Sequence, residues 1–352
     1  MARRRVWRPS GRTAIGWGVV SLALVVVVAA VLARDHPSST TKQPATTDAP
    51  SAATQGPVPV TAVQVQSLGS LLPRGLSGLS AAPLNGQIYL FGGYGNGQWS
   101  RVIYDFNPAS EQLQAVGNLP VALHDAGAAA GADSVVLCGG GQTVGSKAIL
   151  AFTPGQAVMA EGSLPVPLSD DEGVTVGTLP YCLGGWTGQV YSDAVYSVGS
   201  LQGGVPTVAA QLPDAVRYAA AVEQNGGILV AGGLVASGSP TDVLQWVPLP
   251  QGVGQMPQVV GQLPSPLAWA MGAVLGSSAL VMGGCGTSGT PVSGIEAVRP
   301  SGTVHTVGQL PVALCDGAAA SSAGAIYVFG GEGAGNQPER TVWKITQIIG
   351  TS

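Results

Sequence analysis

Three aspartates stand at the same place in a recurring phrase of this sequence. Each lies six residues after the Leu of a Leu-Pro pair: Asp125, Asp170 and Asp316. Carboxylates that face one site can divide the roles of general acid and general base, as hydrolysis of a glycosidic bond requires. The same groups can instead accept hydrogen bonds from the hydroxyls of a bound ligand. A structural role stays open as well, because Asp ahead of a strand often hydrogen-bonds to the backbone of its own turn.

Aromatic and basic side chains occupy neighbouring positions of the phrase. The sixth position is Tyr218 or Trp269 in two further copies, and the fifth is His124 or Arg217. Aromatic faces stack on the CH groups of sugars, so these residue types predict a carbohydrate ligand, unless the rings only pack between structural units. Residues that directly follow a later Gly-Gly pair complete the set. The candidate binding residues are His124, Asp125, Asp170, Arg217, Tyr218, Trp269, Asp316, Tyr94, Trp186 and Glu332.

Other chemistries have little support. The three histidines, His36, His124 and His305, lie far apart in the chain, so we expect no metal site. The Gly-rich runs "GGYGNG" and "GGGQTVG" each lead into another apolar strand rather than a helix, which disfavours phosphate binding. We therefore expect no cofactor. A Ser-His-Asp triad around His124 stays open, although no nucleophile elbow accompanies it.

The phrase belongs to a repeat with six copies. In every copy the first Gly of a Gly-Gly pair comes 20 residues after the Leu, whereas whole repeats vary from 45 to 51 residues. A constant interior with variable connections is typical of a repeated structural unit. The Leu-Pro pairs start at Leu72, Leu119, Leu164, Leu212, Leu263 and Leu310, and the Gly pairs at Gly92, Gly139, Gly184, Gly232, Gly283 and Gly330.

Each repeat reads as four short strands. A run of small residues follows the phrase, then a turn, an apolar burst that ends at the Gly pair, a third apolar segment and a weaker fourth. Four such strands form a small antiparallel sheet, and six sheets around an axis form a β-propeller with small residues on the crowded inner strands. The last repeat lacks a fourth strand. We expect Thr61 to Gln66, within residues 60–70, to complete the blade that begins at Ala318.

With a Gly pair after an apolar strand and a period near 50, residues 58–352 resemble the kelch repeat family. Their fourth strands lack the Trp that kelch units usually carry, as in "EQLQAV" and "GTVHTV". The resemblance implies an all-β six-bladed propeller that binds a protein or carbohydrate ligand at its mouth, or partners along its blade edges. Kelch-type copper oxidases need several His ligands, which are missing here. Some periplasmic kelch propellers are sugar mutarotases, so a mutarotase or glycosidase-like enzyme is the alternative function, although the thin supply of catalytic residues favours binding.

The cysteines form two pairs in neighbouring repeats. Cys285 directly follows a Gly pair and Cys315 lies at the fifth position of the next repeat, which places both on one rim of the propeller. We expect a disulfide between them in an exported protein; the alternative is two buried thiols. Cys138 and Cys182 lie in second strands of adjacent blades, and either state is open for them.

The N-terminal part has the composition of a membrane anchor. Residues 1–13 hold five arginines and predict a cytoplasmic tail, and residues 14–33 form a charge-free apolar stretch long enough to span a bilayer. A cleaved signal peptide is the alternative. Residues 34–57 are rich in Ser, Thr and Pro and predict a disordered linker. We therefore expect a single-pass membrane protein with an extracytoplasmic propeller. From Pro57 onward, 16 acidic and 7 basic residues leave a charge of −9, which argues against a nucleic-acid partner.

Overall fold

The computed structural model describes residues 59–249 and 255–349. These residues form strands and turns, and no helix able to span a membrane occurs among them. The basic tail expected at residues 1–13, the membrane span expected at 14–33 and the linker expected at 34–57 lie outside the described residues.

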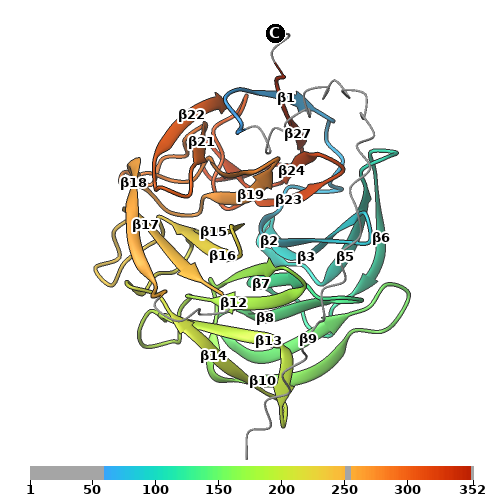
Figure 1. Ribbon diagram of the computed structural model, residues 1–352. Coiled ribbons are helices and arrows are strands. Elements are labelled where there is room, and N and C mark those ends of the chain that lie inside the picture. The colour runs from blue at the N-terminus through green and yellow to red at the C-terminus, as the bar shows by residue number, and fades with distance from the viewer. Residues whose placement is uncertain (1–58, 250–254, 350–352) are drawn as a thin grey trace, which may run out of the picture. The chain divides into compact units, whose positions relative to one another are not determined.

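Six four-stranded antiparallel sheets are arranged around a central axis (Figure 1), so the predicted all-β six-bladed propeller is confirmed. From the axis outward, blade 1 consists of β2 (Ser77–Leu84), β3 (Gln87–Gly95), β5 (Val102–Asn107) and β6 (Gln112–Asn118), with β4 (Gln98–Trp99) beside β3. Blade 2 consists of β7 (His124–Ala130), β8 (Val135–Gly141), β9 (Ser146–Phe152) and β10 (Met159–Leu168). Blade 3 consists of β11 (Glu172–Val176), β12 (Leu179–Leu183), β13 (Ala194–Gln202) and β14 (Val205–Gln211).

The second half of the chain continues the same order. Blade 4 consists of β15 (Ala220–Gln224), β16 (Gly227–Ala231), β17 (Thr241–Pro248) and β18 (Gln258–Leu267). Blade 5 consists of β19 (Met271–Leu275), β20 (Ser278–Met282), β21 (Gly294–Val298) and β22 (Val304–Gln309). Blade 6 consists of β23 (Ala318–Ser322), β24 (Ala325–Phe329), β27 (Val342–Gln347) and β1 (Val63–Ser67), with the short pair β25 (Glu332–Gly333) and β26 (Gln337–Pro338) beyond the Gly pair.

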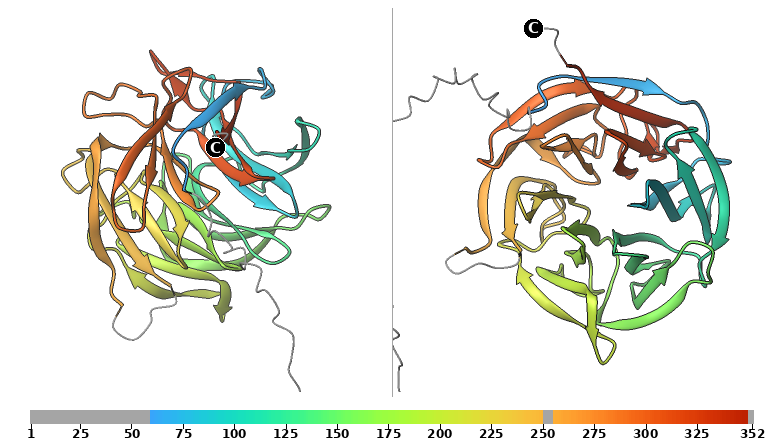
Figure 2. Two further views of the ribbon diagram at one scale, coloured as in Figure 1. Left: turned by 45° about the horizontal axis from the view of Figure 1, so that its top comes forward. Right: turned by 45° about the vertical axis from the view of Figure 1, so that its right-hand side comes forward.

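The first described strand lies at the outer edge of the last blade. β1 pairs antiparallel with β27, with Val63 opposite Gln347 and Ser67 opposite Trp343. Figure 2 shows the blue β1 beside the dark red β27. The two ends of the propeller therefore share one sheet, and this pairing closes the ring.

Small residues line the axis because the six inner strands contact one another in a ring. β2 contacts β7 and β23, and the order continues through β11, β15 and β19. The larger apolar side chains of the strands behind them pack between neighbouring blades, where six buried clusters form the core. The fold is thus held together blade to blade, while its axis is left to short side chains.

In five of the six blades, the Gly pair hydrogen-bonds to the backbone just ahead of the next blade. Gly92 and Gly93 have φ values of 68° and 95°, a region open to glycine. Gly93 N–H donates to the Leu123 carbonyl at 2.9 Å, just ahead of blade 2. A side chain at Gly92 would collide with that same carbonyl oxygen. Equivalent bonds of 2.8 to 2.9 Å run from Gly185, Gly233, Gly284 and Gly331.

Candidate functional site

Two positions of the repeat meet on the mouth rim of every blade. The fifth residue after the Leu is the cross-strand partner of the residue that follows the Gly pair. In blade 3, Ser169 and Trp186 exchange backbone hydrogen bonds of 3.1 and 2.7 Å. The other partners are Ser77 with Tyr94, His124 with Gly141, Arg217 with Leu234, Ala268 with Cys285, and Cys315 with Glu332. Side chains from both positions therefore surround the mouth.

The sixth positions form an inner ring. All six residues have positive φ, from 51° to 61°: Gly78, Asp125, Asp170, Tyr218, Trp269 and Asp316. Backbone N–H groups at five of these positions donate to the carbonyl of the same position in the preceding blade, at 2.8 to 3.1 Å. A Tyr or Trp with positive φ is strained, and such strain persists only where the surroundings enforce it. The ring therefore fixes these side chains at the axis.

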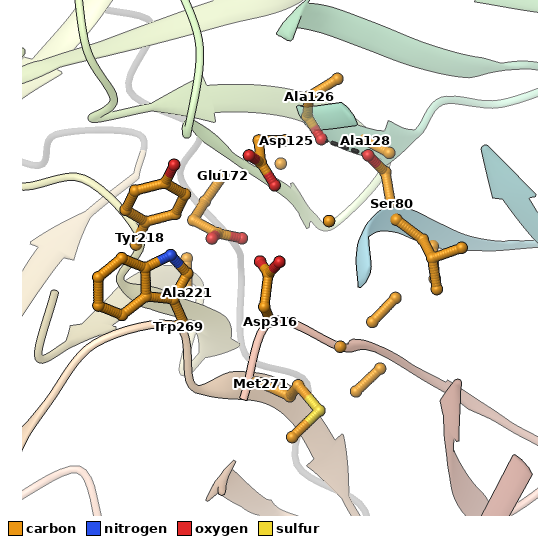
Figure 3. A pocket seen from close by; sticks show the side chains of 18 of the residues that line it. Ser80, Asp125, Ala126, Ala128, Glu172, Tyr218, Ala221, Trp269, Met271 and Asp316 are labelled. Atoms are coloured by element: carbon orange, nitrogen blue, oxygen red, sulfur yellow. Dashed lines mark hydrogen bonds between the residues drawn. The ribbon is translucent and has the colours of Figure 1, made fainter. Parts of the chain in front are cut away.

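Carboxylates and aromatic rings converge in a pocket of about 100 Å³ at this ring. Figure 3 shows Asp125, Glu172 and Asp316 pointing toward one space, with Tyr218 and Trp269 beside it. The two rings stack with centroids 4.7 Å apart and planes inclined by 32°. We call this space, between the inner strands at the mouth, the axial pocket.

Two of the axial carboxylates have cationic partners at the rim. His124 Nδ1 lies 2.5 Å from Asp125 Oδ2, and Arg217 Nη1 donates to Asp170 Oδ2 at 3.0 Å. The side chains of Asp125 and Asp170 are 8% and 7% exposed. Within the described residues, Glu172 and Asp316 form no ion pair. The pocket therefore holds more acidic groups than nearby cations compensate.

Burial raises the pKa of several of these acids. It raises the pKa of Asp170, together with the charge of Asp125, although Arg217 opposes the shift. For Asp171, Glu172 and Asp316, burial and neighbouring carboxylates hold the pKa well above its usual value. Burial lowers the pKa of His124, but the hydrogen bond and charge of Asp125 outweigh it, so that this pKa is raised overall. The acids of the pocket are therefore easier to protonate than carboxylates in water.

A wider groove opens beside the axial pocket, between the rim loops of blades 2 and 3. Its volume is about 570 Å³, and its wall includes His124, Trp186 and Arg217. The Arg217 guanidinium lies 5.7 Å from the Trp186 ring centroid, 5.2 Å from that of Tyr191 and 5.0 Å from that of Tyr218. Gln142, Thr143, Thr187 and Gln189 add polar groups. Asp170 and Tyr218 line both spaces, so that the groove adjoins the axial pocket.

The structure divides the candidate binding residues into three groups. Asp125, Asp170, Tyr218, Trp269 and Asp316 line the axial pocket. His124, Trp186 and Arg217 line the groove. Tyr94 and Glu332 line neither space: the Tyr94 ring lies 6.2 Å from that of His124, and Glu332 accepts a hydrogen bond from Ser77 Oγ at 2.9 Å.

Sequence reasoning missed one acidic residue of the axial pocket, Glu172, which directly follows Asp171. Both follow Asp170 at the start of an inner strand, where the other blades have Ala or other uncharged residues. The available signal was a pair of charged residues in a run that is otherwise small and uncharged. An inner strand has no solvent-exposed outer face, so a charged residue there is unusual.

Both cysteine pairs are joined in the structure. Cys138 and Cys182 link β8 to β12, with Cα atoms 6.4 Å apart. Cys285 and Cys315 link the rims of blades 5 and 6, with Cα atoms 5.4 Å apart. The second disulfide borders the axial pocket, because Cys315 precedes Asp316 and Cys285 pairs with Ala268, which precedes Trp269.

Among the described residues, no three His, Cys, Asp or Glu side chains are placed to hold a metal ion. The axial carboxylates, although they point toward one space, are therefore not arranged as a coordination sphere.

Comparison with known proteins supports the fold. Residues 75–120, which span blade 1, match the Kelch motif family, so the predicted resemblance to kelch repeats is confirmed. Among solved structures, the chain is similar to one titled "Structure of YjhT", with 15% sequence identity and a TM-score of 0.67. The alignment covers 77% of this chain and 95% of that chain, and at this identity it shows the fold alone. No curated protein sequence matches the chain.

Proposed function

We propose that this chain is a membrane-tethered ligand-binding module whose propeller lies outside the cytoplasm. The tether is supported by the charge-free apolar stretch at residues 14–33, by the arginines ahead of it and by the Ser/Thr/Pro-rich residues 34–57. Kelch propellers commonly bind proteins or other ligands, and the mouth of this propeller is lined by charged and aromatic residues.

The observation that carries the proposal is the shared wall of the two spaces. Asp170 and Tyr218 line both the groove and the axial pocket, so a ligand seated in the groove reaches the acidic groups at the axis. Arg217 connects the groove with the axial pocket, because it pairs with Asp170 and stacks on Trp186 and Tyr218. Concave sites with a few fixed polar groups and perturbed titratable residues are the usual places for small ligands.

The groove is suited first to a carbohydrate. The ring of Trp186, which meets that of Tyr191 edge to face with centroids 5.5 Å apart, lines the groove and offers an apolar face to sugar CH groups. The amide and hydroxyl side chains around them can exchange hydrogen bonds with sugar hydroxyls. A protein segment with polar and aromatic residues would use the same contacts.

Thermal-shift titration of the full-length chain in mild detergent tests this proposal. The panel contains neutral sugars, cell-wall fragments and short peptides. A saturable rise in melting temperature is expected for a groove ligand. The rise should disappear in Trp186→Ala and persist in Trp99→Ala, a control on blade 1 whose side chain is 37% exposed outside the groove. Equal responses from both variants would place the ligand elsewhere.

One observation favours a second candidate, a carbohydrate-active enzyme. The pKa of Asp316 is held well above its usual value by burial and by the charge of Asp125, so Asp316 is suited to donate a proton while another rim carboxylate, Asp125 or Asp170, accepts one. Mutarotation and glycoside hydrolysis assays over a broad sugar panel, with Asp316→Asn as the comparison, test this alternative. If sugars bind but are not turned over, the enzyme alternative is wrong and the proposal of a binding module stands.

A further inference from the structure

Acidic side chains line the axial pocket, and no Lys, Arg or His is among its described lining residues. Asp125, Asp170, Asp171, Glu172 and Asp316 line it, and its other lining residues are small, apolar or aromatic. Its two nearest cationic partners, His124 and Arg217, are each already paired with one carboxylate. The inner part of the pocket is therefore left with uncompensated acidic groups, which is costly in a buried place.

Glu172 is the clearest of these groups. It is the first residue of β11, and its side chain points into the pocket beside Tyr218 (Figure 3). No hydrogen bond or ion pair within the described residues engages its carboxylate, and its pKa is held well above the usual value by burial and by the charges of Asp171 and Asp125. An acid aimed into a pocket without a partner needs a proton or a cation there.

Asp171, the neighbour of Glu172, adds negative charge beside the same wall. It is 4% exposed and lies in the interface between blades 2 and 3, where Oδ2 accepts a hydrogen bond from Gly127 N–H at 3.3 Å and Oδ1 lies against Gly139. Buried polar atoms are nearly always satisfied in folded proteins. The backbone of blade 2 therefore holds Asp171, while its charge raises the pKa of Glu172 and adds to the need for a proton or a cation beside that group.

The geometry favours an organic cation over a metal ion. No group of His, Cys, Asp or Glu side chains within residues 59–249 and 255–349 can hold a metal. An ammonium group presents three N–H donors that can reach carboxylates spaced around it. The stacked rings of Tyr218 and Trp269 border the same space, and aromatic faces attract ammonium groups. Ala126, Ala128 and Met271 provide apolar surface for an alkyl stem.

We propose that the axial pocket binds a protonated alkylamine group, which contacts Glu172 and Asp316 and lies against Tyr218 and Trp269. This inference rests on the proposed binding function and names the chemical group that reaches the axis. A pocket of about 100 Å³ accepts the end of an amine rather than a sugar ring. A free amine and a lysine side chain share this chemistry.

The experiment uses the full-length chain in mild detergent, at pH 8 and low salt, with n-butylamine as the probe and 1-butanol as its neutral counterpart. We expect saturable binding of n-butylamine and none of 1-butanol. The Kd of n-butylamine should rise about tenfold or more in Glu172→Gln, which removes a charge at nearly constant size. Glu161→Gln, an exposed position on the outer strand β10, is the matched control and should leave the Kd unchanged.

A second variant keeps the test independent of one residue. Asp316→Asn should weaken n-butylamine binding in the same direction, and circular dichroism should show that both variants stay folded. Equal binding of n-butylamine and 1-butanol, no binding of n-butylamine, or an unchanged Kd in both Glu172→Gln and Asp316→Asn would overturn the proposal.

The source of the amine is distinguished by a peptide arm. The peptide acetyl-Gly-Lys-Gly-amide is compared with the same peptide carrying acetyl-lysine. If only the unmodified peptide binds, and more tightly than n-butylamine, the pocket takes a lysine of a protein; if n-butylamine binds and neither peptide does, it takes a free amine. Both results support the proposal. Loss of amine binding with retained Trp186-dependent groove binding would refute this inference and leave the proposed function standing.

Discussion

The interfaces on opposite sides of the ring, between blades 2 and 3 and between blades 5 and 6, are both crossed by a disulfide, yet they differ in packing. The apolar cluster between blades 5 and 6 contains 15 buried residues. The cluster between blades 2 and 3 contains only 8, and two of these are Cys138 and Cys182. The interface with the smaller apolar core has its disulfide inside that core, whereas the other has its disulfide at the mouth rim.

The interface between blades 2 and 3, which has the smaller apolar core, also holds polar side chains. Asp171 is buried against Gly127 at the upper part of the blade 2–blade 3 interface, and the groove opens above it. Apolar burial is the main source of stability in such interfaces, so a binding site placed there lowers the packing that holds the blades together. The groove and the Cys138–Cys182 disulfide therefore belong to the same interface, and the disulfide links the two blades where the groove reduces their contact.

Removal of each disulfide in turn should give the largest difference in stability between the two interfaces. Loops of 44 and 30 residues are closed by the two bonds, and loop entropy alone makes their contributions nearly equal. We expect Cys138→Ser/Cys182→Ser to lose about 2 to 5 kcal/mol of stability and to lose clearly more than Cys285→Ser/Cys315→Ser. Melting temperatures and urea midpoints of both double variants measure the difference; equal losses would show that packing does not distinguish the interfaces.

Arg217→Ala tests the electrostatic part of the same interface. It leaves Asp170, whose side chain is 7% exposed, without its cation. Breaking a buried pair from one side costs about 3 to 5 kcal/mol; because the Arg217 side chain is 26% exposed, solvent reduces the cost, and we expect about 1 to 3 kcal/mol. Urea denaturation measures it. Lys344→Ala, which breaks the more exposed pair with Glu111 at 2.7 Å, should cost no more than about 1 kcal/mol.

The inner ring illustrates how much of the site the sequence could predict. The fixed spacing after each Leu-Pro pair placed the sixth positions on one rim, and these residues do form a hydrogen-bonded ring of positive φ around the axis. The repeat made this prediction possible, because the sixth residue has the same backbone position in every blade. The structural alternative for the aspartates, a bond to their own turn, is not what Asp125 and Asp170 form: they pair with His124 and Arg217.

Other features escaped sequence reasoning because no repeat encodes them. Glu172 belongs to an inner strand, where periodicity predicts a small residue and gives no reason to expect a charge at the axis. The groove depends on the loops after the Gly pairs of blades 2 and 3, whose sequences differ from blade to blade. Tyr94 and Glu332 share a repeat position with Trp186, but loop geometry keeps them out of both spaces. Individual loops, unlike strands, carry no common pattern.

Glu172→Gln should stabilise the protein near neutral pH. The pKa of Glu172 is well above its usual value in the folded state, so the folded protein binds more protons than the unfolded chain over that range. Stability therefore rises as the pH falls from neutral toward about 4, where unfolded Glu also titrates. The variant should melt at a higher temperature than the unchanged protein at pH 7 and lose part of this pH dependence in thermal melts from pH 4.5 to 8. Glu161→Gln, on the exposed face of β10, should leave the slope unchanged; an identical slope in Glu172→Gln would contradict the assignment.

The smallest expected effects on stability come from an exposed valine in the groove and an exposed valine on an outer strand. Val144 lines the groove and is 79% exposed, whereas Val208 lies on the outer strand β14 and is 56% exposed. Val→Thr at either position should change the free energy of unfolding by less than about 0.5 kcal/mol, because little packing is lost at exposed sites. If ligands contact the groove, Val144→Thr should weaken the affinity of a groove ligand roughly two- to fivefold through lost apolar contact, and Val208→Thr should not. An affinity that changes only in Val208→Thr would move the binding surface to the outer edge of blade 3, away from the interface between blades 2 and 3.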